Sequence, residues 1–149
     1  MNAEDRNRLV RSGRARWTGT LAKGQGGLST ASGALQDQRY AFATRFGQEQ
    51  GTNPEELIAA AHAGCYCMAL VYALGQAGKP PEHVEATAAL SLQLSPQGPS
   101  VTAVRLSVQA RVPGISAAEF EQHAQLAKAT CLVSRLLNTE VSVDAVLLD

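Results

Sequence analysis

Three cysteines carry the most distinctive chemistry in this sequence. Cys65 stands in the middle of a long apolar segment, Cys67 follows two positions later, and Cys131 lies in the last quarter of the chain. A cysteine thiolate is a nucleophile that can attack a peroxide oxygen or an acyl carbon. For a single cysteine on an apolar helix, however, the commoner role is that of a small core side chain.

Cys65 and Cys67 point away from each other if their segment is helical, because two residues lie about 200° apart around a helix. That separation argues against a metal site of the Cys-x-Cys kind. The rest of the sequence has no set of Cys and His residues with the spacing of zinc ligands. We therefore expect no metal, and we expect Cys67 to fill core space.

His62 lies one helical turn before Cys65. It could act as the base for a cysteine nucleophile, which would make the protein a cysteine acyl hydrolase. An uncharged histidine that fills core space is the competing interpretation. No sequence feature marks an oxyanion hole, so acyl hydrolysis is the lesser alternative.

Cys131 differs from the other two cysteines because it stands at the start of a predicted helical turn, Val133–Leu137. Unpaired N–H groups and the dipole at the start of a helix favour a thiolate. Cys65 is in the middle of its helix and lacks this help. It therefore needs a cation from elsewhere to become a thiolate.

Arg45 is the candidate cation, because apolar residues flank it. An arginine held away from water needs a carboxylate partner, which Glu55 or Glu56 could supply. Glu55 precedes Cys65 by ten residues, or about 15 Å along an unbroken helix, and cannot touch it directly. Either Arg45 bridges this gap, or the acid comes from a partner chain's helix, or the helix is broken.

A long central helix is predicted from Pro54 to Ala77, and it would hold Cys65. Asn53 has the features of an N-cap, and Glu56 stands three residues later, as in a capping box. Gly78 and the two prolines that follow it end the segment. With the rise per residue of an α-helix, this segment would be roughly 36 Å long.

Residues 57–74 of this helix carry no charged side chain, so a membrane span is one interpretation. A histidine, two glycines and many alanines favour a buried helix in a soluble domain instead. A helix that is apolar on all sides needs more cover than one short chain easily supplies. The sequence therefore predicts a dimer.

The remaining segments alternate between strand and helix patterns, and tight turns separate them. Together they predict an α+β fold of order βββ-α-ββ-αα-β, with helices on antiparallel sheets. We expect residues 1–13 to form a flexible N-terminal arm and residues 14–149 a single domain. The predicted strands are residues 14–21, 28–32, 38–46, 84–94, 101–112 and 141–147, and the two further helices are residues 116–129 and 131–137.

The composition narrows the classes of partner. The sequence has 13 Lys and Arg residues and 13 Asp and Glu residues, and so no net charge. This balance gives no support for binding to nucleic acid or to an anionic membrane surface. The first residues lack the apolar core of a secretory signal, so we expect a cytoplasmic protein with reduced thiols.

Two motifs resemble the osmotically inducible protein C and organic hydroperoxide resistance (OsmC/Ohr) family. One is GTNPEEL at residues 51–57 followed by AAHAGCY at residues 60–66, and the other is AKATCLVS at residues 127–134. Gly33 and residues 42–46 and 112–115 also match. The extended first motif and Arg45 resemble the OsmC branch more than the hydroperoxide-resistance branch.

The resemblance implies an intertwined homodimer, with sheets wrapped around two long central helices and two sites at the interface. It also implies a thiol-dependent peroxidase that reduces organic hydroperoxides to alcohols, as a defence against oxidative and osmotic stress. Cys65 would form a sulfenic acid, and Cys131 would resolve it as a Cys65–Cys131 disulfide. Arg45 would hold the thiolate, and Glu55 would hold Arg45.

The same resemblance implies no bound cofactor but an external dithiol reductant, such as a lipoyl protein or a thioredoxin-like protein. The chain departs from the family pattern at two positions. Leu132 stands where the family usually has Pro, and Cys67 where it commonly has Ser. A non-enzymatic stress protein that senses redox state or binds a small ligand is the alternative function.

Overall fold

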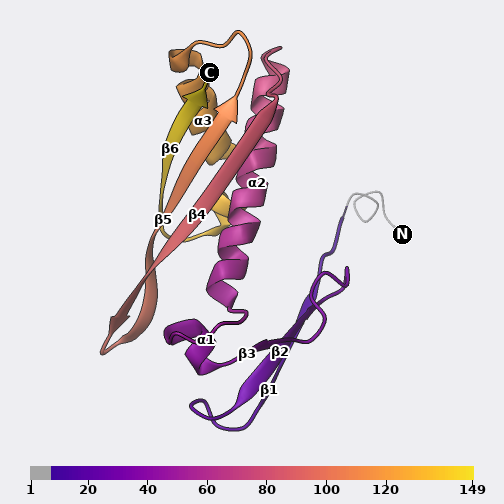
Figure 1. The fold of residues 1–149 in the computed structure, drawn as a ribbon, viewed down its shortest axis with the longest axis vertical. Helices are drawn as coiled ribbons and strands as arrows, with labels where there is room; N and C mark the ends of the chain where they lie inside the picture. The colour runs from indigo at the N-terminus through magenta and orange to yellow at the C-terminus, as the bar shows by residue number, and fades with distance from the viewer. Residues whose placement is uncertain (1–7) are drawn as a thin grey trace. The chain divides into compact units, whose positions relative to one another are not determined.

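A computed structural model describes residues 8–149 of the chain (Figure 1). The chain divides into two compact units, an N-terminal unit that ends at Pro54 and a C-terminal unit of residues 55–149. Residues 1–7 of the predicted arm lie outside the described residues, and the first strand begins at Gly13. The prediction that residues 14–149 act as one domain stays a prediction, and each unit is described by itself.

The N-terminal unit is a three-stranded antiparallel sheet with one short helix. The strands are β1 (Gly13–Thr18), β2 (Gln25–Thr30) and β3 (Gln38–Tyr40), in the order β1-β2-β3, and the helix is α1 (Phe42–Phe46). Gly26 on β2 permits a close approach, since a Cβ atom there would lie 2.4 Å from the ring of Tyr40. Trp17 packs on the same ring, with 5.4 Å between the ring centroids.

The prediction of a strand over residues 38–46 was wrong beyond Tyr40. Thr44 closes a helical turn there, because its hydroxyl accepts a hydrogen bond from the Ala41 N–H at 2.9 Å. Phe42 and Phe46, four residues apart, then stack on one face of α1 with 5.1 Å between their ring centroids. Arg45 is therefore a helical residue and not the end of a strand.

The C-terminal unit combines a three-stranded sheet with three helices. Its elements are α2 (Pro54–Gln76), β4 (His83–Ser95), β5 (Gly98–Arg111), α3 (Ala117–Thr130), α4 (Leu132–Leu136) and β6 (Glu140–Leu148). Pro54, the first residue of α2, is also the last residue of the N-terminal unit. The α+β class and the long central helix are thus confirmed. Including α1, the order is βββ-αα-ββ-αα-β.

The sheet of this unit is mixed, whereas the sequence predicted only antiparallel pairing. β4 and β5 form an antiparallel hairpin that closes at Ser95 and Gly98. β6 instead pairs in parallel with β5, with Val104 opposite Val141. Because two parallel neighbouring strands need a crossover connection, the segment with α3 and α4 carries the chain back to the level of Ala103, where β6 begins beside β5 (Figure 1).

One hydrophobic core joins α2, β5 and α3. From Val104 to Ala110, every second side chain of β5 is buried, as the alternation in its sequence predicts, whereas the first half of the strand has no buried side chain. Ser116 caps α3 through a capping box with Glu119, also as predicted. The buried core residues are Tyr66, Leu70 and Leu74 of α2, Leu106, Val108 and Ala110 of β5, Val112 just after β5, Phe120 and Ala127 of α3, and Cys131.

Within residues 8–149, α2 is the one helix that is long and apolar enough to cross a membrane by length and composition. One of its faces packs on the sheet of its own unit, which is typical of a core helix. The opposite face leaves Met68 77% and Tyr72 69% exposed. A single chain therefore covers only part of this helix.

The contact between Tyr66 and α3 gives a test of the core. The Tyr66 side chain is fully buried, and its hydroxyl donates a hydrogen bond to the Ala124 carbonyl at 2.9 Å. We expect Tyr66→Phe to lower the free energy of unfolding by about 1 kcal/mol, because a buried acceptor loses its partner. Urea denaturation at fixed protein concentration measures this change. Tyr72→Phe, on the exposed face, is the matched control, and equal stability of both variants would contradict the prediction.

Candidate active site

Cys65 and Cys131 come from different elements of the C-terminal unit. Cys65 is half-buried on α2. Cys131 is only 1% exposed and lies in extended backbone between α3 and α4, where it ends one helix and begins the next. Its N–H donates to the Ala127 carbonyl at 2.8 Å, and its carbonyl accepts from the Arg135 N–H at 3.1 Å. Backbone hydrogen bonds to the helix before and to the helix after therefore fix the position of Cys131.

The two thiols are hydrogen-bond partners of each other. Cys65 also packs against the core cluster that contains Cys131. Two of the four predicted site residues are thus brought together from distant parts of the sequence. A pair of thiols in contact, of which one is almost inaccessible to water, can hold a proton between them and can be oxidised to a disulfide.

The surroundings of Cys131 favour its thiolate. Burial raises the pKa of Cys131, but hydrogen bonds to its sulfur outweigh that effect and lower the pKa overall. The donors are the hydroxyl and the backbone N–H of Ser134, the Cys65 thiol and the N–H of Val133. The sequence argument that the start of a helical turn assists Cys131 agrees with this arrangement.

The surroundings of Cys65, in contrast, disfavour its thiolate. Burial raises the pKa of Cys65, and the neighbouring Cys131 raises it further. The backbone N–H groups of Val133 and Leu132 donate to the Cys65 sulfur and lower the pKa in part. Within the C-terminal unit, the surroundings therefore favour a thiolate on Cys131 more than on Cys65, and Cys65 needs a further cation to become the anion.

The Leu132 N–H belongs to a residue at which this chain departs from its expected family pattern. A proline has no N–H, so it could not make this hydrogen bond to Cys65. The substitution thus adds a donor for the Cys65 thiolate.

His62 is fully buried, and its Nε2 atom lies 2.6 Å from the Ser134 hydroxyl. Burial lowers the pKa of His62, so the imidazole is neutral near pH 7. The hydrogen-bond partner of Nε2 is thus Ser134 and not Cys65. Sequence reasoning assigned no role to Ser134, although its position three residues after Cys131 in a helical turn places both on one face.

Arg45 lies on α1 in the N-terminal unit, and its guanidinium stacks over the Phe46 ring at 4.8 Å. It lines a cavity of about 460 Å³. Glu55 lies in the first turn of α2, at the start of the other unit. The roles of Arg45 and Glu55 toward Cys65 stay predictions. The other residues that line the cavity are Trp17, Gly19, Leu21, Tyr40, Ala41, Phe42 and Phe46.

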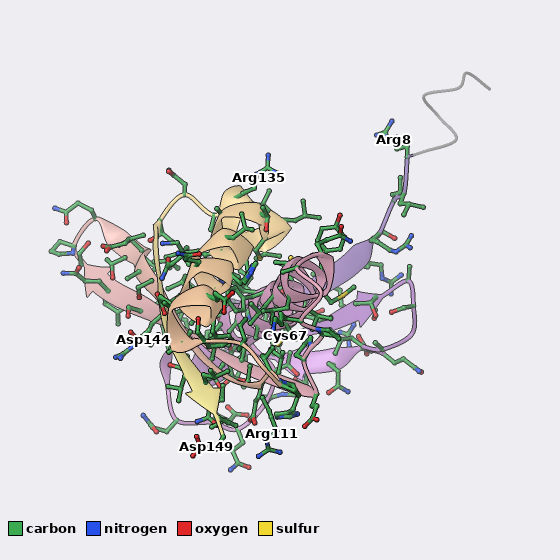
Figure 2. The ribbon with its side chains drawn as sticks, turned by 90° about the horizontal axis from the view of Figure 1, so that it is seen from above. Arg8, Cys67, Arg111, Arg135, Asp144 and Asp149 are labelled. Atoms are coloured by element: carbon green, nitrogen blue, oxygen red, sulfur yellow. The ribbon has the colours of Figure 1, made fainter. Side chains whose placement is uncertain are left out.

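Cys67 is separate from the thiol pair. Burial raises its pKa, and the donor near its sulfur is the backbone N–H of Ala86 on β4, not a residue of α4. Figure 2, which looks down on the molecule, labels Cys67 on α2 and Arg135 at the outer surface. In residues 8–149 no three His, Cys, Asp or Glu side chains gather in a way that could hold a metal ion.

Comparison with known proteins supports the resemblance in the sequence. Residues 47–146 match the family model described as OsmC-like protein. The chain is 46% identical to the peroxiredoxin OsmC of Escherichia coli strain K12 over 136 residues, which cover 91% of this chain and 95% of the relative. The aligned region of 136 residues extends well beyond the two cysteine motifs.

Solved structures share the fold. An OsmC-like protein of unknown function from Vibrio cholerae has a TM-score of 0.73 at 18% identity, covering 93% of this chain and all of that one. An organic hydroperoxide resistance protein OsmC from Legionella pneumophila has a TM-score of 0.67 at 23% identity, covering 95% and 100%. At these identities, the structural likeness establishes the fold alone.

Replacement of Leu132 tests the added donor. We expect Leu132→Pro to raise the pKa of Cys65, because the variant lacks the N–H that now points at the sulfur. Cys131, the residue before it, has φ −60° and ψ 121°, a conformation that a following proline accepts. The rate of Cys65 alkylation as a function of pH, followed in a Cys67→Ser background, measures the shift. Leu132→Ala is the control, because it keeps the backbone N–H. The same pH dependence of Cys65 alkylation in both variants would contradict the prediction.

Proposed function

The chain belongs to the OsmC family, and from that premise we propose that it is a thiol-dependent peroxidase that reduces organic hydroperoxides to alcohols. The observation that carries the proposal is the hydrogen-bonded pair of Cys65 and Cys131. The name of the Escherichia coli relative, a peroxiredoxin, supports the same chemistry. The OsmC branch suggests a role in defence against oxidative and osmotic stress.

The proposed reaction has three steps. The Cys65 thiolate attacks the distal peroxide oxygen, which releases an alcohol and leaves a sulfenic acid on Cys65. Cys131 attacks that sulfur, and a disulfide and water form. An external dithiol, from a lipoyl protein or a thioredoxin-like protein, then reduces the disulfide by exchange. In this scheme the protein needs no bound cofactor or metal.

Arg45 would supply the cation that Cys65 needs to become a thiolate. A guanidinium beside Cys65 would draw the negative charge from Cys131 onto the attacking sulfur, and Glu55 would orient that guanidinium. The aromatic cavity beside Arg45 offers apolar surface for the alkyl or aryl part of a hydroperoxide. A small, polar hydrogen peroxide gains nothing from such surface.

We also infer a homodimer in the cytoplasm. The uncovered face of α2 presents exposed apolar side chains that a second α2 could bury. At Gly64 and Gly75 of this helix, no atom lies within 4 Å of the position of a Cβ atom. Small residues at such positions allow two helices to approach closely. The exposed apolar side chains of this face are Ile58, Met68, Val71 and Tyr72.

Consumption of cumene hydroperoxide with a dithiol reductant tests the proposed function. We expect the wild type and Cys67→Ser to turn over, Cys65→Ser to be inactive, and Cys131→Ser to stop after about one equivalent or to over-oxidise. A wild type that forms the disulfide without turnover would instead indicate a redox sensor. Activated-ester hydrolysis that survives Cys131→Ser but not His62→Ala would indicate an acyl hydrolase.

The aromatic cavity predicts substrate preference. We expect Phe46→Ala to lower kcat/KM for cumene hydroperoxide about tenfold, since apolar contact with the substrate is lost. The value for hydrogen peroxide should change little, which makes it the internal control. Steady-state kinetics with both peroxides measure the ratio. Equal wild-type activity on the two peroxides would show that the cavity does not select the substrate.

A further inference from the structure

The two sulfurs of the proposed disulfide differ in their access to solvent. Cys131 is 1% exposed and belongs to the core cluster, together with Phe120 and Ala127 of α3. Cys65 is half-buried and packs against this cluster without being part of it. In the proposed reaction a peroxide must also reach the Cys65 sulfur, whereas Cys131 reacts only with Cys65. An approach from solvent is therefore required for one of the two sulfurs alone.

The geometry of substitution at sulfur links the peroxide step to the reduction step. A thiolate attacks a sulfur atom in line with the bond that breaks, from the side opposite to the leaving atom. When Cys131 attacks the sulfenic acid, the departing oxygen must therefore lie on the side of Cys65 that faces away from Cys131. A dithiol that attacks the same sulfur of the disulfide must come from this side as well. Attack on Cys131 would instead require a path through packed core side chains.

Ser134 is placed to receive the negative charge of Cys131 when that sulfur leaves. Its hydroxyl and its backbone N–H both donate to the Cys131 sulfur, and its oxygen lies 2.6 Å from Nε2 of His62. Nδ1 of His62 is buried and has no partner in the part of the chain that the structure describes. A proton on Nδ1 would be an unpaired donor in the core, so Nε2 carries the proton and donates to Ser134. The hydroxyl hydrogen of Ser134 therefore remains available for the sulfur.

The Cys131 sulfur becomes a better hydrogen-bond acceptor when the disulfide opens. A disulfide sulfur accepts weakly, whereas a thiolate accepts charge-assisted hydrogen bonds. The two donors of Ser134 therefore gain strength as the bond breaks, and a better stabilised thiolate leaves faster. We propose that the external dithiol attacks the Cys65 sulfur from the position that the peroxide oxygen occupied, and that Ser134 stabilises Cys131 as the leaving thiolate. This route deepens the proposed peroxidase function and rests on it. Ser134 contacts a reacting sulfur and is thus a catalytic residue of the reduction step.

Atoms and electrons balance along this route. One thiolate of the dithiol bonds to the Cys65 sulfur, the bond between Cys65 and Cys131 breaks, and its electron pair leaves on Cys131, which takes a proton from solvent. The second thiol of the reductant loses its proton and attacks the reductant's first sulfur. An internal disulfide forms on the reductant, the mixed disulfide breaks, and Cys65 is released as a thiolate. The protein has gained two electrons, the dithiol has lost two, and Cys65 is ready for the next peroxide.

A monothiol probe identifies the sulfur that is attacked. The Cys67→Ser variant, oxidised to the disulfide with diamide, is exposed briefly to β-mercaptoethanol, which forms a mixed disulfide but has no second thiol to release it. Acid quenching, alkylation of free thiols with N-ethylmaleimide in denaturant and peptide mass spectrometry then locate the adduct. We expect mercaptoethanol on Cys65 and maleimide on Cys131 in most molecules that carry the adduct. Adducts on Cys131, or an equal mixture of the two, would overturn the proposal.

Ser134→Ala separates stabilisation of the leaving thiolate from a general effect on structure. We expect this variant to slow the reduction of the Cys65–Cys131 disulfide by dithiothreitol about tenfold, and Ser134→Thr to keep most of the rate. The control is the mixed disulfide of Cys65 with thionitrobenzoate in a Cys67→Ser and Cys131→Ser background. Dithiothreitol attacks the same sulfur there, but thionitrobenzoate leaves, so Ser134→Ala should not change the rate. No slowing of the first reaction, or equal slowing of both, would overturn the role of Ser134.

Diamide oxidation keeps failure of this route distinct from failure of the proposed function, because it needs no peroxidase activity. If the wild type consumes no cumene hydroperoxide but the adduct lies on Cys65, the peroxidase function fails while the route of exchange stands. Peroxide turnover with the adduct on Cys131 would have the opposite meaning. A protein in which diamide forms no Cys65–Cys131 disulfide would overturn both.

Discussion

A sulfur atom that is cut off from water can carry a negative charge only where other donors replace the lost solvent. The break between α3 and α4 supplies these donors, because a helix that starts anew leaves its first N–H groups without partners. The N–H groups of Leu132 and Val133 point at Cys65, and those of Val133 and Ser134 at Cys131. The positions and protonation of both thiols depend on this short stretch of backbone.

One side of α2 serves the core and the site together. His62, Cys65 and Tyr66 lie within one and a half turns, so the face that builds the core also presents the reactive thiol. Tyr66 ties α2 to α3 through the Ala124 carbonyl, close to the end of the helix that Cys131 terminates. The distance between the two sulfurs is thus set by core packing on rigid elements and not by a mobile loop.

The sequence predicted the elements with strong local patterns and missed those that depend on distant partners. The limits of α2, the Ser116 capping box and the β4–β5 hairpin all follow from short-range signals. The short helix α1 was taken for a strand, because its apolar residues also suit a strand and only the Thr44 hydroxyl closes the turn. Parallel pairing of β6 and the contact of His62 with Ser134 arise from the crossover, which no local pattern reveals. The joint site of Arg45, Glu55 and Cys65 rests on the family resemblance.

The parallel pairing of β6 has a consequence for the order of folding. The β4–β5 hairpin closes through a short turn and can form from local contacts, whereas β6 reaches β5 only after α3 and α4 have crossed the sheet. Until then Cys131 has no fixed place, while Cys65 and Cys67 already stand on the same helix. In an oxidising refolding mixture, we expect the nascent unit to be most vulnerable to wrong disulfides in this interval. The same crossover that creates the thiol pair therefore also makes the pair one of the last features to form.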